Sequence, residues 1–175
     1  MTWIYIAFLL VSMAHMAEEY LYPGGFMDFM KRLNPRFKPV ITTRMAVIVN
    51  GLQLLLCVAL IVMGRHTLVF GLSVATLLLV NGLVHIGGCF RIRGYAPGVF
   101  TGALFYLPLS LYAWRVGISS GQLTVMGMLA SVLLGLLYQA VPIGYLALAS
   151  TIRRRQGDRT PVAHRRVEEG GFGGG

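Results

Sequence analysis

The chain has 175 residues, of which 56% are hydrophobic and only 12% are charged. A soluble domain usually carries about twice that share of charge. This composition excludes an ordinary soluble domain and indicates an integral membrane protein. The net charge of +9 would suit a nucleic-acid-binding protein, but the basic residues lie between long apolar runs, where membrane topology explains them better. We therefore expect no nucleic acid partner, with the lipid bilayer as the environment of the chain.

Long apolar runs predict five transmembrane helices, because about 20 mostly apolar residues span the hydrocarbon layer. In chain order they cover residues 2–22, 43–63, 68–87, 97–116 and 123–151. Pro142 predicts a kink in the last of them. The predicted fold class is therefore all-α, a polytopic membrane protein built as a bundle of five transmembrane helices. The membrane domain is expected to cover residues 1–152, followed by a basic, glycine-rich, disordered tail over residues 153–175.

The loop between the first two predicted spans contains "FMDFMKRL", which predicts a short amphipathic helix on the membrane surface with its Phe and Met side chains facing lipid. Lysines and arginines are concentrated in this loop, in the link after the third span, and in the tail. The opposite side has only Arg65 and Arg115. By the positive-inside rule the N-terminus is expected outside and the C-terminus in the cytoplasm, in the inner (plasma) membrane.

Ionisable residues interrupt the apolar segments, which is costly in a membrane and typical of functional sites. The first segment holds His15, Glu18 and Glu19 at helical spacings that place all three on one face. The third holds Asn81 and His85, four residues apart. The depth of four of these residues, His15, Asn50 of the second segment, Asn81 and His85, is predicted to be roughly 9–15 Å from the cytoplasmic border. Groups far apart in sequence thus fall in one polar layer.

Histidine and glutamate side chains on facing helices build metal sites in helical bundles. We expect one divalent ion, iron, zinc or manganese, held by His15, His85 and a carboxylate of Glu18 or Glu19, because the other segments offer only neutral groups. The same four residues are the catalytic candidates, either through the metal or as general acid and base without one. The candidate substrate-binding residues are Asn50, Asn81, Thr101 and Tyr138.

Each of these residues also has a purely structural interpretation. Either glutamate could pair with Arg44 or Arg91 at the interface, and His85 could be a satisfied buried imidazole. Asn50 could hydrogen-bond a neighbouring helix without binding anything. Packing or hydrogen bonding between helices is the favoured interpretation for four further polar residues, namely Gln53, Tyr106, Tyr138 and Gln139.

The motif "HMAEE", the pair Asn81 and His85 in "NGLVH", and the segment "GYAPGVFTGALFYLPLSLYAW" together resemble the HXXEE-domain proteins. These are small, mostly bacterial membrane proteins whose motifs suggest an enzymatic role. The resemblance implies that the motif positions here are His15, Glu18, Glu19, Asn81 and His85, with Pro97, Gly98 and Thr101. Ala96 departs from the pattern, in which a polar residue, often asparagine, stands between the tyrosine and the proline.

The favoured hypothesis is a membrane enzyme with a site open to the cytoplasmic side, acting on a lipid-like or apolar small molecule. Metal-assisted hydrolysis or oxidation and acid-driven isomerisation or cyclisation remain open. The alternatives are a proton- or ion-coupled small transporter, for which a homo-oligomer could complete the path, and a non-catalytic membrane partner protein whose polar residues join the helices.

Overall fold

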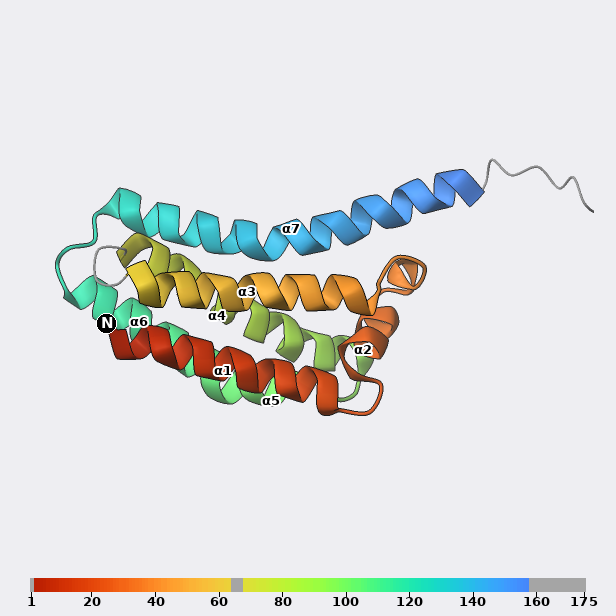
Figure 1. Ribbon diagram of the computed structural model, residues 1–175, viewed down its shortest axis with the longest axis horizontal. Helices are drawn as coiled ribbons and strands as arrows, with labels where there is room; N and C mark the ends of the chain where they lie inside the picture. The colour runs from red at the N-terminus through yellow and green to blue at the C-terminus, as the bar shows by residue number, and fades with distance from the viewer. Residues whose placement is uncertain (1, 64–67, 158–175) are drawn as a thin grey trace, which may run out of the picture.

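The computed structural model describes residues 2–63 and 68–157, and these residues form helices and no strand. The elements in chain order are α1 (Thr2–Leu21), α2 (Gly25–Leu33), the 3-10 turn η1 (Pro35–Phe37), α3 (Thr43–Met63), α4 (Leu68–Ile92), α5 (Val99–Thr101), the π-helix η3 (Gly102–Tyr106), α6 (Leu107–Ser119) and α7 (Val125–Gly157). The predicted all-α class is confirmed. The long helices run side by side along one axis (Figure 1).

Four helices are long and apolar enough to cross a membrane, namely α1, α3, α4 and residues Val125–Gln156 of α7. They support the prediction of a membrane protein. The expected span over residues 97–116 is instead made by three successive segments, α5, η3 and α6, none of which has that length alone. Pro108 explains the division, because its ring clashes with the carbonyl of Leu104 in a regular α-helix and the widened π turn relieves that clash.

Helix α4 forms the centre of the bundle and packs against α7, α6 and η3, while α1 packs against α3. More than half of the apolar window of α4 is buried, against 11% for α7, whose outer face has the exposed apolar side chains of a lipid-facing surface. Small residues allow the backbones of neighbouring helices to approach each other closely. A Cβ on Gly82 would lie 3.1 Å from the carbonyl oxygen of Gly102, and one on Gly135 would lie 2.6 Å from that of Ser73.

The predicted orientation of the short helix α2 is wrong, because its apolar face turns into the protein instead of toward lipid. Phe29 is fully buried and Met30 is 8% exposed, and both pack in a cluster with Phe37, Ile41, Ala96 and Leu146. Gly88 of α4 makes the room, since a Cβ there would lie 2.5 Å from the Phe29 ring. The many dispersion contacts of these closely packed side chains stabilise this orientation.

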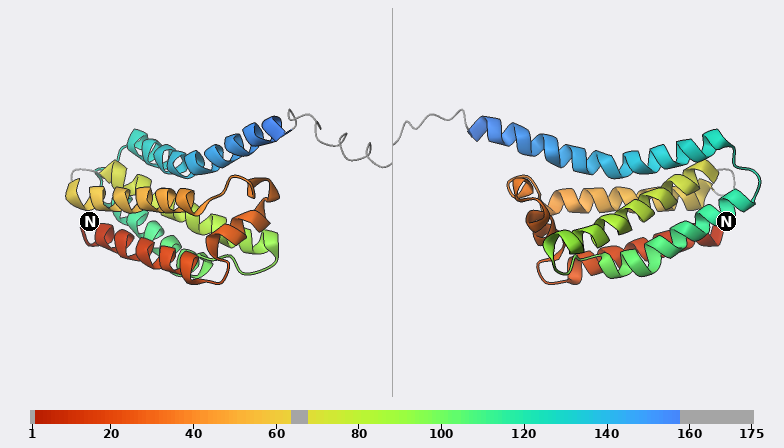
Figure 2. Two further views of the ribbon diagram at one scale, coloured as in Figure 1. Left: turned by 45° about the vertical axis from the view of Figure 1, so that its right-hand side comes forward. Right: turned by 180° about the vertical axis from the view of Figure 1, so that it is seen from behind.

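Helix α2, the link between α4 and α5, and the C-terminal end of α7 lie at the same end of the bundle in all views (Figures 1 and 2). Three basic segments therefore share one end, as the topology argument requires, and Arg153 donates a hydrogen bond to the carbonyl oxygen of Pro39 across it. Pro142 lies within α7 and does not end it, and the helix continues to Gly157. The expected tail thus begins later than residue 153, and its remainder lies outside the described residues.

Candidate functional site

His15 and Glu19 of α1 and His85 of α4 meet inside the bundle and form what is here named the His–Glu cluster. The three residues are 2%, 3% and 1% exposed. The Oε1 atom of Glu19 lies 3.6 Å from Nε2 of His15 and 3.2 Å from Nε2 of His85. The two imidazole rings meet edge to face with their centroids 4.8 Å apart. One helical turn separates His15 from Glu19, so the sequence spacing itself places them on one face.

Gly98, in the link between α4 and α5, lies directly against both imidazoles. Its φ angle of +93° belongs to the left-handed region, which glycine occupies without steric cost. A Cβ at this position would lie 2.6 Å from Cε1 of His15 and 2.9 Å from Nδ1 of His85. Only glycine therefore allows the link to close over the cluster while both rings keep their positions.

The His–Glu cluster has the composition and spacing of a metal site. One ligand atom from each residue lies within 4.8 Å of the other two. With ligand distances of about 2.0–2.1 Å, the edge of a tetrahedron around a divalent ion measures about 3.3 Å, and the observed separations from Glu19 are 3.6 and 3.2 Å. Nε2 of His15 and Nδ1 of His85 are buried and have no hydrogen-bond partner among the described residues. Two histidines and one carboxylate leave a coordination position open, which is typical of catalytic rather than structural sites.

Glu18 points the other way, toward the start of α5, and lies outside this group. Its Oε2 atom accepts hydrogen bonds from the Thr101 backbone at 2.8 Å and the Thr101 hydroxyl at 2.6 Å. Its Oε1 atom accepts from the Phe100 backbone at 3.1 Å and from the Tyr95 hydroxyl. No side chain of its own caps α5, and a carboxylate suits the free N–H groups at a helix start. Glu18 thus caps α5 from a neighbouring helix.

The Thr101 hydroxyl joins the two glutamate environments. It lies 2.7 Å from Nδ1 of His15 while its single proton is directed to Glu18. His15 therefore donates from Nδ1 to Thr101, which leaves Nε2 directed at Glu19 as an electron-pair donor. This assignment of the tautomer follows from the hydrogen-bond pattern. A hydrogen bond to the far ring nitrogen is the usual way in which proteins orient a metal-binding histidine.

The other predicted residues lie at different distances from the cluster. Asn50 donates to Oε2 of Glu19 at 3.0 Å. Asn81 donates instead to Gln53 at 3.4 Å, so it reaches the cluster only through other side chains. Tyr138 lies on α7, which packs on the side of the bundle away from α1 (Figure 2). No hydrogen bond joins Tyr138 to the cluster among the residues that the structure describes.

Two tyrosines border the site although the sequence singled out neither as a site residue. The Tyr106 ring lies over His15 with centroids 4.5 Å apart, and its hydroxyl accepts a hydrogen bond of 2.7 Å from Gln53. On sequence grounds, Tyr106 and Gln53 are interpreted as residues that join helices. Tyr95 donates to Glu18, and its place in the Tyr-x-Pro-Gly segment was the available signal. Burial and the Glu18 carboxylate raise the pKa of Tyr95 above its ordinary value, so it remains a donor at neutral pH.

The arginine pairing considered as an alternative is not observed. Within residues 2–63 and 68–157, the basic side chains within 4 Å of Glu19 are the imidazoles of His15 and His85, and no ion pair joins either glutamate to Arg44 or Arg91. Glu19 is therefore a buried carboxylate whose neighbours are two imidazoles and an amide.

A family described as "Protein of unknown function with HXXEE motif" matches residues 6–113, which is more than half of the chain. The chain belongs to the HXXEE family. His15, Glu18 and Glu19 are the histidine and the two glutamates of the motif, and the structure gives the two glutamates different environments. The match ends within α6, so α7 and Tyr138 lie beyond it. No curated protein and no solved structure matches the chain.

Proposed function

We propose that this HXXEE protein is an integral membrane enzyme that binds one divalent metal ion at the His–Glu cluster and acts on a lipid-like or apolar small molecule. One observation carries the proposal. His15, Glu19 and His85 bring one ligand atom each within 4.8 Å of the other two, and all three residues are buried. Buried polar atoms nearly always have partners, and Nε2 of His15, which faces Glu19, has none among the described residues.

The charge balance of the site supports a cation. A buried carboxylate without a counter-charge is strongly unfavourable, and Glu19 has no lysine or arginine partner among the described residues. If Nδ1 of His15 carries the proton, its Nε2 atom and Oε1 of Glu19 are two acceptors that face each other across 3.6 Å. A metal ion between them resolves this conflict. Protonation of a histidine would also remove the conflict between the two acceptors, and the metal analysis below distinguishes a bound ion from a protonated histidine.

The surrounding residues hold the cluster in place. Asn50 fixes the second oxygen of Glu19, Thr101 fixes the His15 ring, and Glu18 fixes Thr101 through two hydrogen bonds. We assign Glu18 a positioning role and Glu19 a ligand role. A bound metal ion would polarise a substrate oxygen or activate water at its open position. Two histidines and a carboxylate occur at hydrolytic zinc sites and at oxidative iron sites, so the identity of the metal selects the reaction class.

The same proposal includes the topology of the protein. Helical segments α5, η3 and α6 follow one another without a gap from Val99 to Ser119, and we propose that together they form the fifth span. The shared basic end of the bundle (Figure 1) is then cytoplasmic by the positive-inside rule, with the N-terminus outside and the inner membrane as location. The His–Glu cluster lies in the half of the bundle nearest that end, because His15 and Glu19 belong to the last two turns of α1.

Elemental metal analysis of the detergent-purified protein tests the proposal. We expect close to one iron, zinc or manganese ion per chain in the wild type, and less than about a tenth of that in His15→Ala and in His85→Ala, because each loses one of only three ligands. Cys57 and Cys89 are free thiols and the matched controls, so Cys57→Ala and Cys89→Ala should keep the metal. No metal after supplying all three ions, in a protein with intact helical content, refutes the proposal.

A proton-coupled carrier is a second candidate, because one specific observation favours it. Hydrogen bonds and close contacts run from Tyr95 through Glu18, Thr101 and His15 to Glu19, and such relays serve proton movement in transporters. Proton transport would be detected by reconstituting the protein into liposomes that contain a pH-sensitive dye. Proton flux that requires Glu19 and persists after chelation of metal supports the carrier, while the absence of flux in a metal-loaded protein supports the enzyme.

A further inference from the structure

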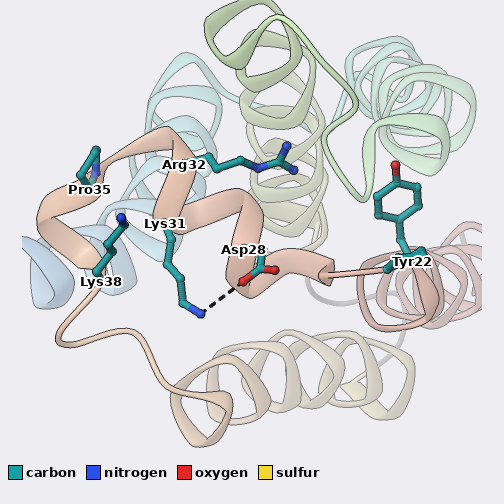
Figure 3. Close-up of a pocket in the computed structure, with 7 residues that line it drawn as sticks. Tyr22, Asp28, Lys31, Arg32, Pro35 and Lys38 are labelled. Carbon is teal, nitrogen blue, oxygen red and sulfur yellow. Dashed lines mark hydrogen bonds and ion pairs between the residues drawn. The ribbon is translucent and has the colours of Figure 1, made fainter.

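A second polar feature lies beside the His–Glu cluster, on the outer side of α2. A hollow of about 620 Å³ is lined by Tyr22, Pro23, Asp28, Lys31, Arg32, Pro35 and Lys38. It is here named the basic hollow (Figure 3). The hollow is open to the surface, and it lies at the basic end of the bundle (Figure 1).

The charges around the basic hollow do not balance. Three cations and one carboxylate line it, for a net charge of +2. Lys31 lies 3.2 Å from Asp28, whereas Arg32 and Lys38 have no ion pair within the part of the chain that the structure describes. A phosphate monoester carries a charge between −1 and −2 near neutral pH and offers several acceptor oxygens. Arginine and lysine are the side chains that bind such groups.

Helix α2 connects this hollow to the His–Glu cluster. Its inner face places the Phe29 ring in a stacked arrangement on His85, with centroids 5.6 Å apart, while its outer face carries Asp28, Lys31 and Arg32. A second connection runs through Tyr22, which lines the hollow and packs against Tyr95 with the two rings tilted and their centroids 4.4 Å apart. A ligand in the hollow would therefore contact the same helix that covers the cluster.

Apolar surface adjoins the Tyr22 edge of the hollow. Leu21 is 82% exposed and Phe100, whose ring lies 6.3 Å from that of Tyr95, is 63% exposed. In a membrane these side chains face acyl chains. A molecule with a charged head in the hollow could thus extend its apolar chain along α1 and α5, past Glu18 and toward the cluster.

We propose that the basic hollow binds the anionic head of an amphiphilic substrate, specifically a phosphate ester, whose apolar chain lies in the membrane. This inference rests on the proposed function, because it names the substrate class of the same site. A lipid phosphate and free inorganic phosphate share the head chemistry, and the apolar surface beside Tyr22 favours the lipid.

Titration calorimetry with dodecyl phosphate, in an uncharged detergent, tests the hollow. We expect at least about tenfold weaker binding in Arg32→Gln/Lys38→Gln, since two charge-assisted hydrogen bonds are lost. Asp28→Asn should bind about two- to fivefold more tightly, because it removes the only carboxylate of the lining and frees Lys31. Arg154→Gln/Arg155→Gln, which removes the same charge at the end of α7, should bind as the wild type does.

Three results would overturn the inference. These are wild-type affinity in Arg32→Gln/Lys38→Gln, an equal loss in Arg154→Gln/Arg155→Gln, and inorganic phosphate binding as tightly as dodecyl phosphate. Metal content, measured on the same samples, separates this inference from the proposed function. A metal-free wild type that still binds dodecyl phosphate through Arg32 and Lys38 would refute the metal enzyme and support binding in the basic hollow. A metal-loaded protein that does not bind dodecyl phosphate would support the metal enzyme and refute binding in the basic hollow.

Discussion

Glu18 and Glu19 are neighbours of the same chemical type, and the structure predicts opposite consequences for their replacement by glutamine. Each oxygen of Glu18 faces one backbone N–H and one hydroxyl, from Phe100 and Tyr95 on one side and from Thr101 on the other. Whichever way a glutamine amide is turned, its NH₂ group faces a backbone N–H. In either orientation the two hydrogen bonds that this position accepted are lost, and only the hydroxyl can accept one in return from the NH₂ group.

The magnitude follows from those two hydrogen bonds. Hydrogen bonds to charged groups contribute about 1.5–3 kcal/mol each, and Glu18 is half-buried, so water recovers part of the loss. We expect Glu18→Gln to lower the free energy of unfolding by about 2–4 kcal/mol. In Glu19→Gln the amide oxygen can still accept from Asn50 while the NH₂ group donates to an unprotonated histidine. With metal removed by a chelator, we expect that change to stay within about 1 kcal/mol.

Unfolding in mixed micelles, followed by tryptophan fluorescence and circular dichroism, measures the stability difference, and elemental analysis measures the metal. Glu18→Gln should be destabilised and still bind metal where it folds. Glu19→Gln should keep its stability in chelator and lose the metal. The reasoning is refuted if Glu18→Gln is as stable as the wild type, or if Glu19→Gln retains stoichiometric metal.

Three further predictions concern the same region. Gly98→Ala should destabilise the protein by about 2–4 kcal/mol and lower its metal content, because the new Cβ would lie 2.6 Å from Cε1 of His15 in a left-handed backbone. Thermal unfolding and elemental analysis check this prediction, and an unfolding midpoint equal to that of the wild type would contradict it. Tyr95→Phe should lower the free energy of unfolding by about 1–2 kcal/mol from neutral pH to about pH 10. This difference from the wild type should vanish above the raised pKa of Tyr95, where the ionised hydroxyl can no longer donate to Glu18. Equal free energies of unfolding at pH 8 would contradict the prediction. A chelator should lower the melting temperature of the metal-loaded wild type by ligand linkage and leave His85→Ala unchanged, and a scanning fluorimetry shift of the same size in both proteins would contradict the metal site.

The helical pattern of this protein could be read from its sequence, because long apolar runs in a membrane have few alternatives to a helix. The prediction was least accurate where local chemistry divides or extends an element. Pro108 converts the expected span over residues 97–116 into three segments, whereas Pro142 lies inside α7 without ending it. Both prolines remove one backbone donor, and the residue type alone does not distinguish the two outcomes.

Most residues of the candidate site could also be predicted from their spacing in the sequence. The four-residue separation of His15 and Glu19 places them on one helix face, and the polar layer predicted that His85 and Asn50 would lie near them; the distances agree. Tyr138 was a candidate substrate-binding residue on the last predicted span, and no hydrogen bond joins it to the cluster among the described residues. Depth in the membrane can be estimated from sequence, but the direction in which a helix faces cannot.

The sequence by itself determined the helical class, the apolar surface for lipid and the residue types that could bind a metal, because these properties depend on composition and local periodicity. Only the tertiary structure separated Glu18 from Glu19. Adjacent residues on a helix differ by about 100° in direction, so the partner that each carboxylate meets depends on which helices pack on either side of α1. Here α5 meets Glu18 with free backbone N–H groups, and α4 meets Glu19 with an imidazole.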